Sequence, residues 1–260
     1  GASGMAAGVF SARAGARTLV IEKNEKLGRK MYITGKGRCN LTNDASLQDF
    51  ISEVPRNPRF LFSALNQLSP QATMLLVTAH GCPVKVERGR RVFPVSDKAS
   101  DVTKAWGRAL NDAGCDIRLN EAVLSVQRTS EGGWQVNTNR SYHAKALVIA
   151  TGGLSYPSTG SAGDGIRMAR KTGHHIENVL PALVPLVAAE DDIKELQGLS
   201  LKNVTLSVYE GKKRIYNGFG EMLFWSYANL QMLCAAISMG KSKYDRSCYM
   251  VRAKAFKAYK

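Results

Sequence analysis

Two glycines, a helix and an acid-ended strand at the start of the chain most constrain its fold. Gly1 and Gly4 open an alanine-rich helix, and the strand Leu19-Val20-Ile21 ends at Glu22, 18 positions after Gly4. A glycine lets the backbone approach a phosphate or a neighbouring strand without a Cβ collision. The helix start offers unpaired N–H groups to phosphates, and an acid at this spacing accepts hydrogen bonds from ribose hydroxyls. This pattern is typical of a dinucleotide-binding βαβ unit.

The fingerprint lacks its beginning. In the usual Gly-x-Gly-x-x-Gly motif a strand and a first glycine precede the two glycines seen here, and the sequence shows neither. We expect a pyrophosphate to lie against Gly1, Ala2, Ser3 and Gly4, and a ribose to lie against Glu22. An amphipathic helix followed by a strand with a surface glutamate is the alternative interpretation of the same residues.

A glycine-rich, basic loop follows the strand. Residues 22–30 read EKNEKLGRK and residues 35–43 read GKGRCNLTN, so glycine N–H groups converge among several cations that suit phosphates. These segments resemble the BaiN/YhiN-type flavoproteins, a family of FAD-dependent oxidoreductases. The resemblance implies that the loop runs along FAD towards the isoalloxazine, with cofactor contacts from Lys23, Gly28, Arg29, Lys30, Gly37, Arg38, Cys39 and Asn40. Without the resemblance, a basic surface loop would be the simpler interpretation.

A second apolar segment, residues 146–150, runs directly into Thr151, Gly152 and Gly153. Its composition predicts a buried parallel strand, and the small residues after it allow the chain to turn beside a nucleotide. In many FAD proteins an A-T-G-G sequence at this place returns the chain to the cofactor. A parallel strand that ends in a tight turn is the alternative. The family resemblance also implies that the backbone of Ala122 or Val123 lies against the adenine.

Residues 154–165, LSYPSTGSAGDG, precede a helix expected at 166–172. Asp164 is predicted to cap this helix. The segment resembles the family's S-Y-P-x-T-G-S-x-G-D-G element, which implies that the cap also orders the cofactor loop. Tyr156 is the only nearby side chain able to donate a proton at a flavin face, and no residue stands out as a catalytic acid or base.

The chain as a whole is expected to be an α/β protein. The resemblance implies an incomplete two-dinucleotide-binding, glutathione-reductase-like Rossmann-type FAD domain over residues 1–187. Its first strand is missing, and a helical insertion at about 45–80 contains a helix capped by Ser69. A hairpin at 84–95, a helix at 101–113 capped by Ser100 or Asp97, and a β-meander follow. Alternation beyond residue 200 predicts the start of a β-rich insert domain at 188–224.

The family resemblance ends at Phe224. Relatives continue with a T-H-x-G-x-S-G-P turn, whereas residues 225–260 form a basic, tyrosine-rich tail of the kind that a shifted reading frame or a chimeric join would produce. Without the first strand and the later family segments, a parallel sheet would expose apolar edges. We therefore expect this truncated chain to bind FAD weakly or not at all, and to be inactive.

Composition narrows the class of protein and its partners. The chain has 260 residues, 44% of them hydrophobic, a net charge of +15 and five cysteines without a C-x-x-C pair. These features favour a cytoplasmic globular protein with reduced thiols, anionic partners and no metal site. No apolar run reaches membrane-spanning length, and the basic residues lack the aromatic interleaving that base stacking needs, so neither membrane nor nucleic acid is expected.

The expected function follows from the resemblance. NAD(P)H is the expected electron donor, FAD the cofactor, and an unsaturated or carbonyl small molecule the substrate, with hydride chemistry that belongs to the cofactor. Two alternatives stay open. One is an RNA-associated flavoprotein, suggested by the positive charge, and the other is a non-catalytic remnant.

Overall fold

A computed structural model of the chain describes residues 1–54, 57–179, 186–187, 195–227, 230–235 and 250–255. The chain divides into two compact units, of which the first comprises residues 1–51 and 60–177. The second comprises residues 52–59 and 178–260. The sequence places the corresponding domain boundary at residue 187.

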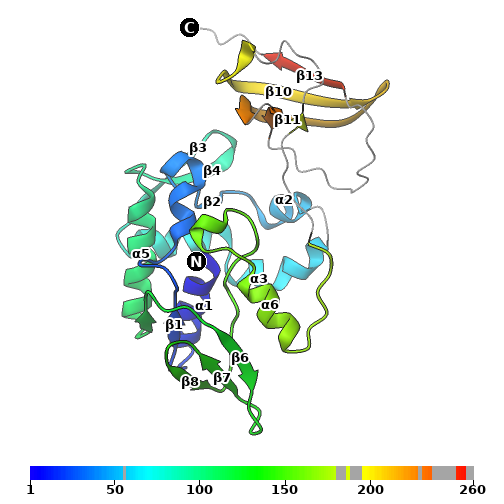
Figure 1. Ribbon diagram of the computed structural model, residues 1–260. Helices are drawn as coiled ribbons and strands as arrows, with labels where there is room; N and C mark the ends of the chain where they lie inside the picture. The colour runs from blue at the N-terminus through cyan, green and yellow to red at the C-terminus, as the bar shows by residue number, and fades with distance from the viewer. Residues whose placement is uncertain (55–56, 180–185, 188–194, 228–229, 236–249, 256–260) are drawn as a thin grey trace. The chain divides into compact units, whose positions relative to one another are not determined.

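A short parallel sheet and three helices form the core of the first unit (Figure 1). β1 (Leu19–Ile21) pairs in parallel with β5 (Asp116–Arg118). α1 (Ala2–Arg13) packs on β1, and both α1 and α4 (Pro70–Ala79) pack on α5 (Ala99–Asp112). The helix and strand expected at the start of the chain are therefore confirmed. The core side chains that these elements bury include Met5, Val9, Val77, Val102, Trp106 and Leu110.

A glycine in the middle of α1 sets how closely this helix packs. A Cβ on Gly8 would lie 2.7 Å from Cδ2 of Leu110 and 2.8 Å from Cγ2 of Val20, closer than carbon atoms pack. Because a side chain would push the helix away from both β1 and α5, the fold needs glycine at this position.

The helical insertion predicted at about 45–80 is confirmed, with α2 (Leu47–Ser52), η2 (Pro58–Leu61), α3 (Phe62–Gln67) and α4. A further short helix, η1 (Arg29–Gly37), lies before it in the segment predicted as a loop. The predicted cap of α4 is confirmed, because Oγ of Ser69 accepts a hydrogen bond from the N–H of Ala72 at 3.1 Å.

The predicted hairpin is also confirmed. β3 (Val84–Glu87) and β4 (Arg91–Pro94) are antiparallel and are joined by η3 (Arg88–Arg90), while β2 (Thr42–Asn43) lies on the other side of β4.

The cap predicted for the following helix is wrong. The N-cap of α5 is Lys98, which makes no side-chain cap bond, and Ser100 lies inside the helix. Asp97 lies one residue before the N-cap, and its carboxylate accepts hydrogen bonds from Lys85 at 2.7 Å and from Arg38 at 3.3 Å. Its carboxylate is thus engaged with ionic partners from outside the helix.

The β-meander is present, but the parallel strand predicted after it is not. β6 (Ser125–Arg128), β7 (Trp134–Asn137) and β8 (Ser141–Ala144) form an antiparallel sheet. Residues 146–150, which follow β8, join no sheet in the described chain. Val148 is 63% exposed and Ile149 is 37% exposed. The physical reason is that β1 pairs only with β5 among the described strands, so no strand lies beside residues 146–150 to share their backbone hydrogen bonds.

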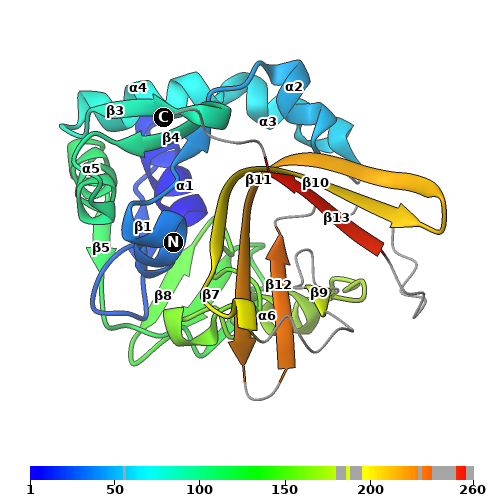
Figure 2. The ribbon, with the colours of Figure 1, turned by 90° about the horizontal axis from the view of Figure 1, so that it is seen from above.

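The first unit ends with a short turn and a helix, η4 (Pro157–Thr159) and α6 (Asp164–Lys171). The described strands of the second unit form one five-stranded sheet (Figure 2). Its strand order is β13-β10-β11-β12-β9, and all pairs are antiparallel. The strands are β9 (Leu186–Val187), β10 (Ser200–Glu210), β11 (Lys213–Tyr227), β12 (Leu230–Ala235) and β13 (Met250–Ala255).

Both long strands of this sheet carry buried apolar side chains, Val204, Leu206 and Val208 on β10 and Met222 and Phe224 on β11. The alternation predicted beyond residue 200 is therefore confirmed. β12 and β13 show that described parts of the predicted tail belong to the same sheet. In the described ranges, no helix combines the length and the apolar composition needed to cross a bilayer.

Candidate dinucleotide-binding site

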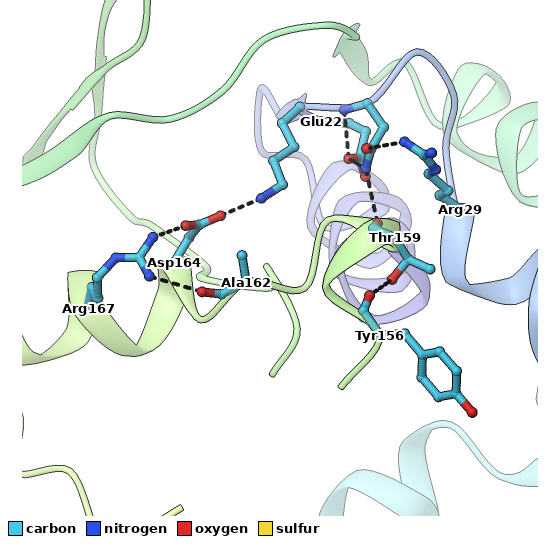
Figure 3. Close-up of polar contacts among 9 residues, drawn as sticks. Glu22, Arg29, Tyr156, Thr159, Ala162, Asp164 and Arg167 are labelled. Carbon is cyan, nitrogen blue, oxygen red and sulfur yellow. Dashed lines mark hydrogen bonds and ion pairs between the residues drawn. The ribbon is translucent and has the colours of Figure 1, made fainter. Parts of the chain in front are cut away.

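The carboxylate of Glu22 lies at the start of α1 (Figure 3). Its Oε2 is 3.4 Å from the nitrogen of Gly1, the N-cap of α1. Its Oε1 accepts hydrogen bonds from the backbone N–H and the side-chain Nδ2 of Asn24, at 3.1 and 2.7 Å. The strand end is fixed as well, since the N–H of Glu22 donates to the carbonyl of Arg118 at 2.8 Å. The side chain is 13% exposed, so the carboxylate has a defined position beside the helix start.

The turn after residues 146–150 lies against the same end of α1. A Cβ on Gly4 would be 3.3 Å from the Cβ of Ala150, so the helix and this segment are in close contact. Gly152 has a φ of +80°, and a Cβ there would lie 2.7 Å from Oγ of Ser161. Thr151, Gly152 and Gly153 are exposed. The structure therefore brings Gly1, Gly4, Glu22 and the Thr-Gly-Gly turn into one region and leaves the backbone of that turn accessible.

Asp164 does not cap α6, so the predicted capping role is wrong. The N-cap is Gly163, at a φ of 80°, and Asp164 is the first helical residue. Its carboxylate instead accepts a 2.5 Å hydrogen bond from Nζ of Lys23 and pairs with Arg167. The bond from Lys23 is the main cause that holds the pKa of Asp164 below its usual value. The hydrogen bond between Asp164 and Lys23 thus links the start of α6 to the end of β1.

The first half of the basic loop also faces this region. Gly28 has a φ of 67°, and a Cβ there would lie 2.9 Å from Cγ2 of Thr103, so the glycine packs against α5. Nη1 of Arg29 donates to Oδ1 of Asn24 at 3.2 Å. Nζ of Lys30 donates to the carbonyl of Ser155 at 2.7 Å and lies 3.3 Å from its Oγ. Lys30 therefore links this loop to the segment around Tyr156.

The second half of the loop turns towards the β3–β4 hairpin. Nη1 of Arg38 donates to Glu87 at 2.9 Å and to Asp97 at 3.3 Å, and its guanidinium lies 3.9 Å from the ring centre of Phe93. The hydrogen bond to Glu87 is the main cause that raises the pKa of Arg38. Arg38, predicted as a cofactor residue, is thus engaged in an ionic cluster on the hairpin.

Left-handed backbone conformations shape this half of the loop. Gly35, Lys36, Gly37 and Cys39 all have positive φ angles. The side chain of Cys39 is buried, which raises the pKa of its thiol, whereas Asn40 is exposed. A buried thiol of this kind is a packing element, whereas Gly37 and Asn40 stay accessible.

Val123 packs against the small apolar cluster of Val126, Val136 and Met168. With Asp164 and Arg167 it lines a cavity of about 90 Å³. A larger cavity of about 280 Å³ lies on the side of residues 146–150 that faces α6 and β7, and it is lined by Trp134, Leu147, Ile149, Ala169, Thr172 and His174. Neither cavity lies at the Glu22 carboxylate.

Two polar residues in this region were missed by the sequence analysis. Asn24 joins Glu22 to the later loop, because its Nδ2 lies 3.4 Å from the carbonyl of Thr159. Its position just after an acid-ended strand was the available signal, since asparagine favours such side-chain-to-backbone turns. Glu121 is buried and accepts hydrogen bonds from Thr138 at 2.5 Å and Tyr142 at 2.8 Å, which lower its pKa. Nothing local in the sequence marks that cluster.

The sequence profile of the HI0933-like protein Rossmann domain matches residues 1–229. Among characterised proteins, the 3-dehydro-bile acid delta(4,6)-reductase of Clostridium scindens is 29% identical over 229 residues. That alignment covers 87% of this chain and 55% of the reductase. The profile confirms the Rossmann-type fold expected from the sequence.

Two further relatives carry another name. The ribosomal RNA dihydrouridine synthase of Escherichia coli is 31% identical over 201 residues, covering 77% of this chain and 49% of the synthase. The protein of the same name from Haemophilus influenzae is 29% identical over 225 residues, covering 84% and 54%. The chain thus spans about half the length of these relatives. A flavocytochrome c3 fumarate reductase in its open conformation is 17% identical, with a TM-score of 0.48 over 76% of this chain and 45% of that one.

Proposed function

Because the chain belongs to the HI0933-like family of BaiN/YhiN-type flavoproteins, we propose that it is the FAD-binding part of an oxidoreductase. FAD, when bound, supplies the hydride chemistry, and reduced nicotinamide is the proposed electron donor. The chain's own residues bind and orient the dinucleotide.

The convergence of Glu22, the start of α1 and the Thr151-Gly152-Gly153 turn carries this proposal. The arrangement fits an adenine dinucleotide, because it combines a fixed carboxylate for ribose hydroxyls with helix N–H groups for phosphates. Glu22 would hold the ribose, and residues 1–4 would face the pyrophosphate. The exposed backbone of residues 151–153 would lie along the cofactor. Lys30 adds positive charge on the adjoining loop.

The names of the relatives suggest a substrate class. Reduction of a 3-dehydro-bile acid at its delta(4,6) positions and formation of dihydrouridine both saturate a carbon–carbon double bond conjugated to a carbonyl. We propose the same class of substrate for this chain. Hydride would reach the carbon distant from the carbonyl, and a proton would reach the adjacent carbon.

A second candidate is that this double bond lies in a uridine of RNA. The two dihydrouridine synthases and the net charge of +15 favour it. Binding of a uridine-rich RNA strand, followed by fluorescence anisotropy as salt is raised, tests it. Affinity should fall linearly with salt on logarithmic axes. Absence of binding at low salt would exclude RNA as the substrate and would leave the hypothesis of a small-molecule substrate.

Equilibrium dialysis against FAD and FMN tests the main proposal. Glu22→Gln should weaken FAD binding about tenfold, the expected loss for hydrogen bonds to a charged group. FMN lacks the adenosine, so its binding should be unchanged. Glu131→Gln serves as the control because Glu131 is an exposed acid in the β6–β7 turn, away from this region. Equal FAD affinities for the two variants, or no FAD binding by the chain at millimolar concentrations, would contradict the assignment.

A further inference from the structure

Tyr156 has an unfavourable backbone conformation. Its φ of 52° and ψ of 65° are left-handed, and Pro157 follows it directly. A bulky side chain disfavours this region, and a following proline restricts it further. The other non-glycine residues with positive φ in the described chain are Lys36, Cys39, Asn57, Arg90, Asp97 and Asn120, so Tyr156 is the aromatic member of this set. Strained residues of this kind cluster at binding and active sites.

The surrounding loop holds Tyr156 in this conformation. Its carbonyl accepts hydrogen bonds from the N–H and the Oγ1 of Thr159, at 2.9 and 2.7 Å. The preceding residue, Ser155, is bound by Lys30, and the carbonyl of Thr159 lies 3.4 Å from Nδ2 of Asn24. The strained turn is therefore fixed from both sides, to the basic loop and to the residue that positions Glu22.

Among the described residues, the side chain of Tyr156 has no polar partner that would offset the strain of its backbone. Tyr156 is 66% exposed, and its hydroxyl has no hydrogen-bond partner among the described residues. Figure 3 shows the ring directed away from Glu22 and Thr159. Glycine would adopt this backbone without strain and would lose little packing. The aromatic ring thus contributes little to the fold of its own unit, although hydrogen bonds hold the backbone that carries it.

We propose that Tyr156 is a stacking platform for a planar conjugated ring bound beside the dinucleotide site. The ring is either the isoalloxazine of the flavin or the conjugated ring of the substrate, and this choice rests on the proposed function. An exposed phenol on an anchored turn provides a flat apolar face with only two side-chain torsions to order, and aromatic rings stack on it with an offset. Tyr156 is a positioning residue that acts through its ring.

Riboflavin is the first probe, because it carries the isoalloxazine without the adenosine that Glu22 would bind. Its fluorescence should be quenched on binding to the wild-type chain. In equilibrium dialysis, Tyr156→Phe should bind riboflavin like the wild type, whereas Tyr156→Gly should weaken binding about tenfold, the loss expected for one stacked ring. Phe60→Ala is the matched control, because Phe60 is 86% exposed and lies on η2. The thermal midpoint of Tyr156→Gly should equal or exceed that of the wild type, which excludes unfolding as the cause.

Uridine and progesterone, both conjugated carbonyl compounds, distinguish the two sources of the ring. If riboflavin binding is unaffected by Tyr156→Gly but binding of either probe to the FAD-loaded chain falls about tenfold, the platform serves the substrate. Unchanged binding of all three would overturn the proposal, as would a loss in Tyr156→Phe equal to that in Tyr156→Gly. The sensitivity of FAD binding to Glu22→Gln is measured separately, so a failure of the platform is distinguishable from a failure of the FAD assignment.

Discussion

The tripeptide Leu-Val-Ile occurs twice in this chain, at residues 19–21 and 147–149, and the two copies have different structures. The first is β1, which pairs along its whole length with β5. The second joins no sheet among the described residues, and its central valine is 63% exposed. The same local sequence therefore gives a paired strand in one place and an unpaired extended segment in the other.

This difference shows that an apolar, β-branched run is not sufficient for a strand. β1 has a parallel neighbour in β5 and a helix above it, where Gly8 allows α1 to approach Val20. Residues 147–149 also have helices nearby, since Ala150 faces Gly4 and Ile149 faces Gly165. What they lack in the described chain is a strand that shares their backbone hydrogen bonds, and only such a neighbour completes a sheet.

The largest expected effect comes from placing a charge at the centre of each copy. Val20→Asp should lower the free energy of unfolding by about 3 kcal/mol, because the carboxylate would be inserted between β1 and α1. Val148→Asp should change it by less than about 0.5 kcal/mol, because that side chain is mostly in solvent. Urea unfolding followed by circular dichroism measures both. Similar losses in the two variants would show that residues 147–149 are packed as tightly as β1.

A smaller effect is expected from substituting alanine for the two glycines of α1 that lie close to these segments. Gly8→Ala should lower the free energy of unfolding by about 1–2 kcal/mol, since overpacking against Leu110 and Val20 exceeds the gain in helix propensity. Gly4→Ala meets only the Cβ of Ala150, at 3.3 Å, so its cost should be offset by helix propensity to within about 0.5 kcal/mol. Thermal unfolding of the two variants provides the comparison. A larger loss for Gly4→Ala would reverse the order of packing that the structure gives.

The smallest effect concerns the ion pair that links the two regions. Lys23 follows β1, and Asp164 begins the helix that packs on residues 149 and 151. Because the bond from Lys23 lowers the folded-state pKa of Asp164, its contribution is fully present above the unfolded-state pKa of about 4. That contribution is lost as the pH falls through the lower folded-state value.

Asp164→Asn should therefore lower the free energy of unfolding by about 1 kcal/mol at pH 7, and this difference from the wild type should shrink as the pH falls below about 4. Chemical denaturation across this pH range tests the dependence. Glu131→Gln is the control because Glu131 is exposed in the β6–β7 turn. A difference between Asp164→Asn and the wild type that grows towards low pH would show that the pair has the opposite linkage.

The sequence by itself determined the features that depend on neighbours along the chain. The glycine-opened helix, the strand ending at Glu22, the Ser69 cap and the β3–β4 hairpin all follow from local spacing, and the structure contains them. The family followed from short motifs as well, because glycines and cations in fixed order are visible without a partner.

Only the tertiary structure decided how distant groups compete for the same atoms. Lys23 donates to the carboxylate of Asp164, 141 residues away, and Lys85 and Arg38 donate to that of Asp97, while neither acid is the N-cap of its helix. Arg38 pairs with Glu87 on the hairpin, and residues 147–149 join no sheet among the described strands although their sequence equals that of β1. A local pattern specifies what a segment can form, whereas the charges and strands that fold against it determine which of those interactions it makes.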